Sequence, residues 1–288
     1  MKFSSRFFLP LLLMLTASSP LRGGAIYPLG IADDKIMAKA YQGDEKLIFR
    51  VSWSGGIKIG ELFMEINRLE DKTERFEIKV SVKDSGMFHF FYPVSDTFVT
   101  IVEGAQRLPV SYEVNQKEGR SYRARRYSEY DQEKGEVRYR KNDQEPVVCQ
   151  TEGGVHNEFS SFFFTRILKL DSGDSVIVPT FADGKRHQVV VRTGELTRLK
   201  GTVRGDVNVI PVTPIMKFKG LYNKDGDTVI WFTDDDCRVP VRINSKILIG
   251  SLTAELVSYE NPLCPDLPEY HSKNLESVLQ QPEFELGD

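Results

Sequence analysis

Hydrophobic and polar side chains alternate along most of this chain, and residues 238–259 show the pattern most clearly. Val239 and Val241 share one face of the first run there, Arg242 lies on the opposite face, and a second alternating run follows Gly250. Successive side chains of a strand project to opposite faces of a sheet. A period of two on both sides of a glycine therefore predicts a half-buried antiparallel hairpin.

The same period recurs through residues 44–260 and predicts about a dozen strands and one substantial helix. The strands are expected at 46–53, 57–69, 75–83, 95–102, 109–116, 120–131, 135–141, 175–181, 186–193, 195–204, 206–212, 228–232 and in the final hairpin. The helix is expected at 158–170, because Asn157 can cap it and apolar residues follow at helical spacing. Its expected buried face consists of Phe159, Phe162, Phe163, Ile167 and Leu170.

These elements predict an all-β fold with one packed helix. Strand twist makes a single sheet of this length curl or close on itself. We therefore expect a large antiparallel curved sheet that forms a barrel or half-barrel, with the helix packed against its concave side. A two-sheet β-sandwich is the alternative.

The first 25 residues have the features of a cleaved secretory signal. Lys2 and Arg6 precede an apolar stretch of about 11 residues, whereas a membrane-spanning helix needs about 20. Small residues before and at Ala25 predict cleavage there, and an uncleaved signal anchor is the alternative. We expect a periplasmic or secreted protein without a transmembrane segment in the mature chain. It would have a lead-in at 26–43, one antiparallel β domain at 44–260 and a Pro-containing tail at 261–288.

The charge balance argues against a nucleic-acid partner. Removal of the signal would take away Lys2, Arg6 and Arg22, so the 38 basic residues become 35 against 41 acidic residues. A nucleic-acid-binding domain normally carries a basic surplus, and the resulting net charge of −6 is the reverse.

The three cysteines predict one disulfide. Cys237 comes just before the final hairpin and Cys264 just after it, so a turn near residue 250 places the two close together. An exported chain allows a Cys237–Cys264 bridge to form. Cys149 is then left over, and three unpaired thiols are the alternative. The cysteine spacing matches no zinc site, so no metal is expected.

Three stretches carry a family resemblance. Residues 231–256 read WFTDDDCRVPVRINSKILIGSLTAEL, residues 45–61 read EKLIFRVSWSGGIKIGE, and 159–166 read FSSFFFTR, followed by FADGK at 181–185. The chain resembles the exported bacterial family called domain of unknown function 3108 over roughly residues 44–260. The resemblance implies an exported, β-rich, non-enzymatic domain, and it supplies no catalytic residues.

No local motif supports catalysis or a cofactor. The four histidines, His89, His156, His187 and His271, lie at no catalytic spacing from a carboxylate or cysteine. The acidic cluster at 234–236 is expected to be a solvated turn, since consecutive residues at a strand end cannot all face one cation. In that turn Asp235 is expected to pair with Arg238 or Arg242. We expect neither an enzyme nor a cofactor.

A basic stretch lies on two strands that are expected to be neighbours. Its members are Arg120, Arg123, Arg125, Arg126, Arg138 and Arg140. It could meet anionic lipid headgroups or a sulfated glycan. The favoured interpretation is the wet face of an antiparallel pair, where nearby glutamates supply opposite charges.

Aromatic clusters are the remaining functional signal, because a curved sheet lined by aromatic rings can enclose an apolar cavity. The candidate lining residues are Phe88, Phe90, Phe91, Phe162 and Phe163. The first hypothesis is an exported binding or carrier module for an apolar ligand such as a lipid. The alternative is a structural or scaffolding protein of the cell envelope that binds a protein partner, with the tail as a docking arm. Simple core filling by these rings stays open.

Overall fold

The structure is a computed structural model that describes residues 27–54, 56–70, 74–86, 88–215, 228–247 and 250–264. The predicted signal and nearly all of the predicted tail lie outside these residues. The first strands are β1 Glu45–Trp53, β2 Ile57–Arg68, β3 Phe76–Asp84, β4 Ser95–Glu103, β5 Leu108–Glu118, β6 Tyr122–Asp131, β7 Glu136–Lys141 and β8 Val147–Gln150. The later strands are β9 Ser175–Ala182, β10 Lys185–Thr193, β11 Thr197–Thr202, β12 Gly205–Ile215, β13 Thr228–Thr233, β14 Pro240–Lys246 and β15 Ser251–Glu260. The helices are α1 Asp34–Ala40, α2 Phe88–Phe91 and α3 Glu158–Ile167.

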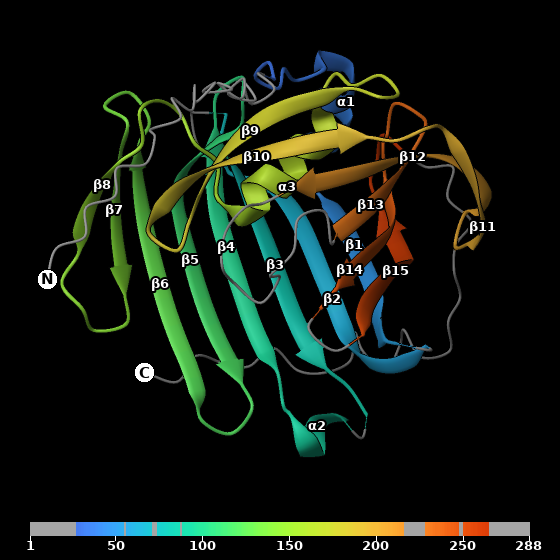
Figure 1. Cartoon of the computed structure of the whole chain (residues 1–288), viewed down its shortest axis with the longest axis horizontal. Helices are drawn as coiled ribbons and strands as arrows, with labels where there is room; N and C mark the ends of the chain where they lie inside the picture. The colour runs from blue at the N-terminus through green and yellow to red at the C-terminus, as the bar shows by residue number, and fades with distance from the viewer. Residues whose placement is uncertain are drawn as a thin grey trace, which may run out of the picture.

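All fifteen strands belong to one antiparallel sheet, which confirms the predicted fold. The main order is β8-β7-β6-β5-β4-β3-β2-β1-β15-β14-β13-β12-β10-β9, and β11 branches off by pairing with β12. The sheet is strongly curved but does not close (Figure 1). Helix α3 lies within the curve, in contact with β9 as well as with β3 and β4. The half-barrel prediction is correct, and the sandwich alternative is wrong.

Alternation explains which residues form the core. Leu47 and Phe49 of β1 and Ile78 and Val80 of β3 are fully buried, while their sequence neighbours turn toward the other face. These inward side chains pack with Phe163 of α3 in the main hydrophobic cluster. Burial of each large apolar side chain stabilises the folded state by about 1.5–3 kcal/mol, so these inward side chains help hold the curved sheet around α3.

Helix α3 begins as predicted but ends earlier. The Asn157 side chain accepts hydrogen bonds from the backbone N–H groups of Phe159 and Ser160, and Ser160 completes a capping box. The helix stops at Ile167 because Leu168 is extended and forms a β-bridge with Ala32. Leu168, which was expected to lie in the last helical turn, therefore pairs instead with Ala32, just before α1.

The buried face of α3 also differs from the prediction. Phe163 and Ile167 are buried as expected, but Phe159 and Phe162 are only half-buried. Phe164 and Arg166 are buried instead. A helix enclosed by a curved sheet buries most of its circumference, so a one-sided face was too narrow an expectation.

The two ends of the main strand order differ. At the β9 end, the backbone N–H of Ile177 donates to the Pro28 carbonyl and that of Phe181 donates to the His156 carbonyl. Two segments thus cover this edge. At the opposite end, β8 pairs with β7 alone among the described strands, and Cys149 donates a hydrogen bond from its Sγ to the Gly184 carbonyl. The prediction contained no strand at β8.

The disulfide between Cys237 and Cys264 is present as predicted, across 27 positions of the chain. Cys149 is free and half-buried. A disulfide of this kind is typical of proteins from oxidising compartments. Among the described residues, no helix has the length and apolar character needed to cross a bilayer.

Candidate binding surface

The concave side of the sheet holds a buried ion pair at the C-terminal end of α3, which we call the C-terminal anchor. The Arg166 guanidinium donates two hydrogen bonds to the Glu45 carboxylate, at 2.5 and 2.8 Å, and both side chains are 0% exposed. Tyr259 and Asn261 each donate a further hydrogen bond to Glu45. The remaining guanidinium donors reach the backbone carbonyls of residues 237 and 238.

This geometry gives Arg166 a structural role. Burial disfavours the charged guanidinium, but the attraction of Glu45 outweighs it and raises the pKa of Arg166 above its ordinary value. The guanidinium therefore stays charged, and its hydrogen bonds and those to Glu45 join α3 to β1, to β15 and to the disulfide-bonded segment. A buried ion pair needs such complete hydrogen bonding to offset its desolvation.

The N-terminal end of α3 is held differently, by a group that we call the N-terminal anchor. Asn157 donates to the Thr100 hydroxyl of β4, and Arg126 of β6 bridges Glu158 and Asp183 at 3.4 and 3.0 Å. Several polar atoms here have no hydrogen-bond partner among the described residues. They are the hydroxyls of Tyr112 and Tyr130, Arg126 Nε and His156 Nδ1.

Burial dominates the titration of this anchor. It lowers the pKa of His156 to about 3, so the ring, which stacks on Phe164, is neutral near pH 7. It also raises the pKa of Glu158, against the attraction of Arg126. The free space beside Tyr112 and Tyr130 is about 10 Å³, which is about the size of one water position. This part of the interior has no room for a lipid.

The aromatic residues predicted to line one cavity are not brought together. Phe162 and Phe163 belong to α3, and Phe163 is fully buried in the core. Phe88, Phe90 and Phe91 form α2, at the far end of the long strands from α3 (Figure 1). Phe90 and Phe91 are among the most exposed large side chains, so they line no interior space.

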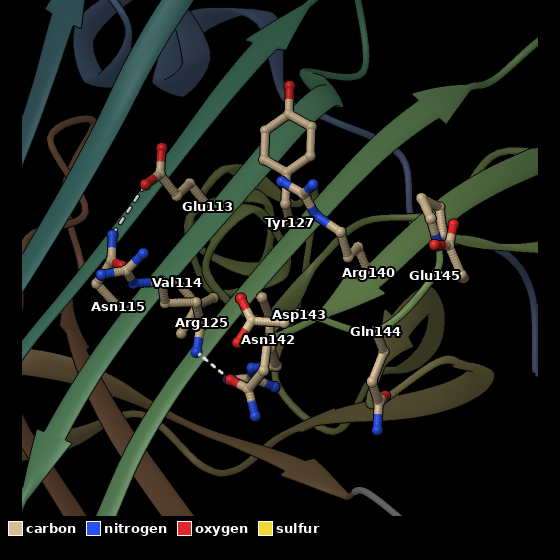
Figure 2. A pocket seen from close by; sticks show the side chains of 12 residues that line it. Glu113, Val114, Asn115, Arg125, Tyr127, Arg140, Asn142, Asp143, Gln144 and Glu145 are labelled. Carbon is tan, nitrogen blue, oxygen red and sulfur yellow. Dashed lines mark hydrogen bonds between the residues drawn. The ribbon is translucent and has the colours of Figure 1, made fainter.

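The larger recesses lie on the outer face of the sheet, opposite α3, over β5, β6 and β7 (Figure 2). One has a volume of about 510 Å³ and is lined by Glu113, Val114, Asn115, Arg125, Arg126, Tyr127, Arg140 and residues 142–146. A second, of about 470 Å³, shares Asn115, Arg125, Asn142 and Asp143 and adds Gln116, Lys117, Arg123 and Ala124. We call the two together the outer recess.

Cross-strand register builds the outer recess. Glu113, Tyr127 and Arg140 are paired across β5, β6 and β7, and Asn115 is paired with Arg125. Odd-numbered positions of β5 and β6 face outward, so these polar side chains share one surface. Figure 2 shows Tyr127 and Arg140 side by side there.

The loop after β7 forms a wall of the outer recess. Asn142 has a positive φ of 52°, and its side chain accepts a hydrogen bond from the Arg125 backbone N–H at 2.8 Å. Its own N–H donates to the Arg125 carbonyl, so the loop is fixed to β6 where β7 ends. Asparagine tolerates this left-handed backbone better than most residues.

The outer recess contains cations that have no ion-pair partner. Lys117, Arg123, Arg125 and Arg140 form no ion pair within the described part of the chain, whereas Arg50 and Arg242 of the same sheet both pair with Glu255. The recess also contains the carboxylates of Glu113, Asp143 and Glu145. These four cationic side chains face three anionic ones, so the site favours an anionic ligand.

The basic stretch therefore divides in two. Arg123, Arg125, Arg138 and Arg140 lie on the wet face as expected, and all are exposed. Arg126 does not, because it is adjacent in sequence to Arg125 and faces inward to the N-terminal anchor. Sequence reasoning grouped the two, although the alternation itself separates neighbours.

The acidic turn is also resolved differently from the prediction. Asp235 accepts hydrogen bonds from the Thr233 hydroxyl and the Cys237 N–H, and it forms an ion pair with Arg204. Asp236 pairs with Lys35 and Lys39 of the α1 region. The predicted ion pairs of Asp235 with Arg238 and Arg242 are therefore wrong, because the Arg238 side chain donates to the Leu168 carbonyl and Arg242 pairs with Glu255. Only the backbone N–H of Arg238 donates to Asp235 in the described residues.

Sequence reasoning missed the Glu45–Arg166 pair. The available signal was Glu45, which shares its strand face with Leu47 and Phe49 and is therefore a charged side chain on an inward face.

The comparisons with known proteins agree with this architecture. The family described as Protein of unknown function (DUF3108) matches residues 48–257. One similar solved structure is a beta-barrel-like protein of domain of unknown function DUF1849 from Brucella abortus. It has 10% sequence identity and a TM-score of 0.52, and the match covers 76% of this chain and 98% of that chain. At this identity the likeness concerns the fold alone. No curated protein matches this chain.

Proposed function

We propose that this chain, which belongs to the DUF3108 family, is an exported, non-enzymatic binding module for an amphipathic anionic ligand such as a lipid. The outer recess is the proposed site. The observation that carries the proposal is the set of cations without ion-pair partners around an open recess of about 510 Å³. Unpaired arginines offer charge-assisted hydrogen bonds to a phosphate or carboxylate headgroup.

The position of α3 favours the outer face over the interior. The concave side is occupied by the helix and its two anchors, and the candidate residue Phe163 is 0% exposed. An apolar chain of a ligand would lie against Tyr127 and Pro146 of the recess wall, where each buried methylene contributes about 0.8 kcal/mol.

The test uses a soluble short-chain phosphatidylglycerol titrated into the full protein, with native mass spectrometry as a second readout. Arg125→Ala/Arg140→Ala should weaken binding by at least about tenfold, because two headgroup donors are lost. Arg138→Ala is the matched control, since Arg138 is exposed on the same face of β7 but does not line the recess. Absence of binding by the unmodified protein, or equal binding by all three proteins, contradicts the proposal.

A scaffolding role is the second candidate, and the free end of the sheet favours it. No strand of the described part of the chain pairs with the outer side of β8, and Val147 and Val148 are 53% and 55% exposed. Exposed apolar edge strands can add a strand from a partner. Val148→Lys should then abolish cross-linking to an envelope partner in cells and leave the lipid titration unchanged.

A further inference from the structure

The rim at the α2 end of the sheet gathers connections that lie far apart in the sequence. Strands β1 to β6 form consecutive antiparallel pairs, so the β1–β2, β3–β4 and β5–β6 connections all meet at one rim. Helix α2 projects from this rim beyond the strand ends (Figure 1). The Gly119 N–H donates to the Pro93 carbonyl, which ties the β5–β6 turn to the α2 connection.

This rim carries half of the large hydrophobic side chains that the described residues expose. They are Trp53, Ile57, Phe90, Phe91, Tyr92 and Tyr122. Phe90 and Phe91, at the tip, are 75% and 79% exposed. Single exposed apolar residues need no explanation, but a group of them at one projecting end marks an interaction site.

The charges of the rim are sorted by exposure. In segments 57–61, 81–97 and 115–125 every basic residue is exposed: Lys58, Lys83, Lys117, Arg120, Arg123 and Arg125. The acidic residues there, Glu61, Asp84, Asp96 and Glu118, are all half-buried or buried.

Internal partners occupy each of those carboxylates. Glu61 pairs with Lys58, and Asp84 contacts His89 at 2.7 Å. Asp96 accepts from the Lys117 N–H, and Glu118 accepts from the Tyr92 hydroxyl. The rim therefore presents cations and aromatic rings to the outside and keeps its anions inside.

We propose that this rim docks on the surface of an anionic lipid bilayer, with Phe90 and Phe91 entering the interface. Aromatic rings partition into the interfacial zone, and surrounding lysines and arginines are attracted to anionic headgroups. A single weak signal gives marginal, reversible attachment, and a second signal strengthens it.

Docking goes beyond the proposed ligand site, because it does not require the outer recess. The two surfaces are nevertheless continuous. Lys117 and Arg123 border the recess and also belong to the rim, next to the β5–β6 turn. A lipid headgroup at the docked surface therefore lies beside the opening of the recess.

The experiment is co-sedimentation of the full protein with vesicles of phosphatidylethanolamine that contain phosphatidylglycerol. Phe90→Ser/Phe91→Ser should weaken vesicle binding by at least about tenfold. Leu29→Ser/Ile31→Ser is the matched control, because these residues are 63% and 72% exposed near α1, at the other end of the strands. The control variant should bind like the unmodified protein.

A second pair of variants separates docking from ligand binding. Lys83→Ala/Arg120→Ala should weaken vesicle binding and flatten its decrease with salt, since exposed charges are screened. In the soluble phosphatidylglycerol titration, Phe90→Ser/Phe91→Ser should bind normally, whereas Arg125→Ala/Arg140→Ala should fail. Either proposal can thus fail while the other holds.

A direct probe comes from Phe90→Trp, whose added tryptophan fluorescence should shift to the blue when anionic vesicles are present.

Equal sedimentation of the Phe90→Ser/Phe91→Ser variant and the unmodified protein overturns the proposal, and so does equal binding to purely phosphatidylcholine vesicles. Concentration-dependent dimerisation that this variant abolishes, without vesicle binding, also overturns it and assigns the rim to a second copy of the chain.

Discussion

The two anchors hold the two ends of α3 against the sheet with very different degrees of burial. At the C-terminal anchor, Arg166 and Glu45 are fully buried and each nitrogen of the guanidinium donates a hydrogen bond. At the N-terminal anchor, Arg126 is partly exposed, its carboxylate partners touch solvent, and two buried tyrosine hydroxyls have no hydrogen-bond partner in the described residues.

The difference shows that burial of a charge alone does not define its role. A fully coordinated pair such as Arg166–Glu45 fixes one arrangement of helix, sheet and disulfide segment, because any loosening leaves a charge unpaired in a dry interior. The N-terminal anchor can exchange hydrogen bonds with water, so losing one contact there costs less.

Arg166→Met should have the largest effect. It leaves the Glu45 carboxylate buried without its cation, which typically costs about 3–5 kcal/mol of unfolding free energy. Arg126→Met is the matched comparison and should cost less, because the side chains of its partners Glu158 and Asp183 stay 29% and 57% exposed and can be hydrated after the change. Urea denaturation of both variants measures the difference, and similar losses would show that the two anchors are energetically equivalent.

Removal of the disulfide should come next. Cys237→Ser/Cys264→Ser opens a loop of 27 positions next to the C-terminal anchor, where the Cys237 carbonyl accepts from Arg166. We expect a loss of about 2–4 kcal/mol, or roughly 5–15 °C in the melting temperature. Cys149→Ser, which removes the free thiol, should leave thermal unfolding nearly unchanged. An unchanged melting temperature in the double variant would contradict this.

The last effect concerns acid stability at the N-terminal anchor. The pKa of His156 is about 3 in the folded protein and 6.5 ordinarily, so between these values only the unfolded chain binds the proton. Stability is therefore lost as pH falls below 6.5, by up to about 1.4 kcal/mol per pH unit. His156→Phe should show a shallower fall in urea midpoint between pH 6.5 and 4, and an identical slope would refute the assignment.

The fold was predictable because the alternation of inward and outward side chains stays recognisable along individual strands. In β1 and β3 the inward positions are Leu47, Phe49, Ile78 and Val80, and the chain order of hairpins fixes the antiparallel pairing. Asn157 predicted the start of α3, and Cys237 and Cys264 on either side of the last hairpin predicted the disulfide. These signals are local, so one sequence contains them.

The candidate site was less predictable because it depends on contacts across the sheet. Nothing near Arg166 in the sequence points to Glu45, which lies 121 positions away. The outer recess requires the pairing of Glu113, Tyr127 and Arg140, which only the register reveals. A cavity lined by both phenylalanine clusters would require α2 and α3 to lie close together, but the length of the long strands separates them (Figure 1).

The covering of β9 by the segments around Pro28 and His156 has a consequence for self-assembly. Growth of a fibre by edge addition requires a sheet that can accept a neighbour at both ends of its strand order. Among the described strands, β8 is the open end of the main order, so two copies that joined at β8 would leave no further acceptor along that order, although β11 keeps an edge of its own. Covering of the β9 end thus limits growth by edge addition along the main strand order.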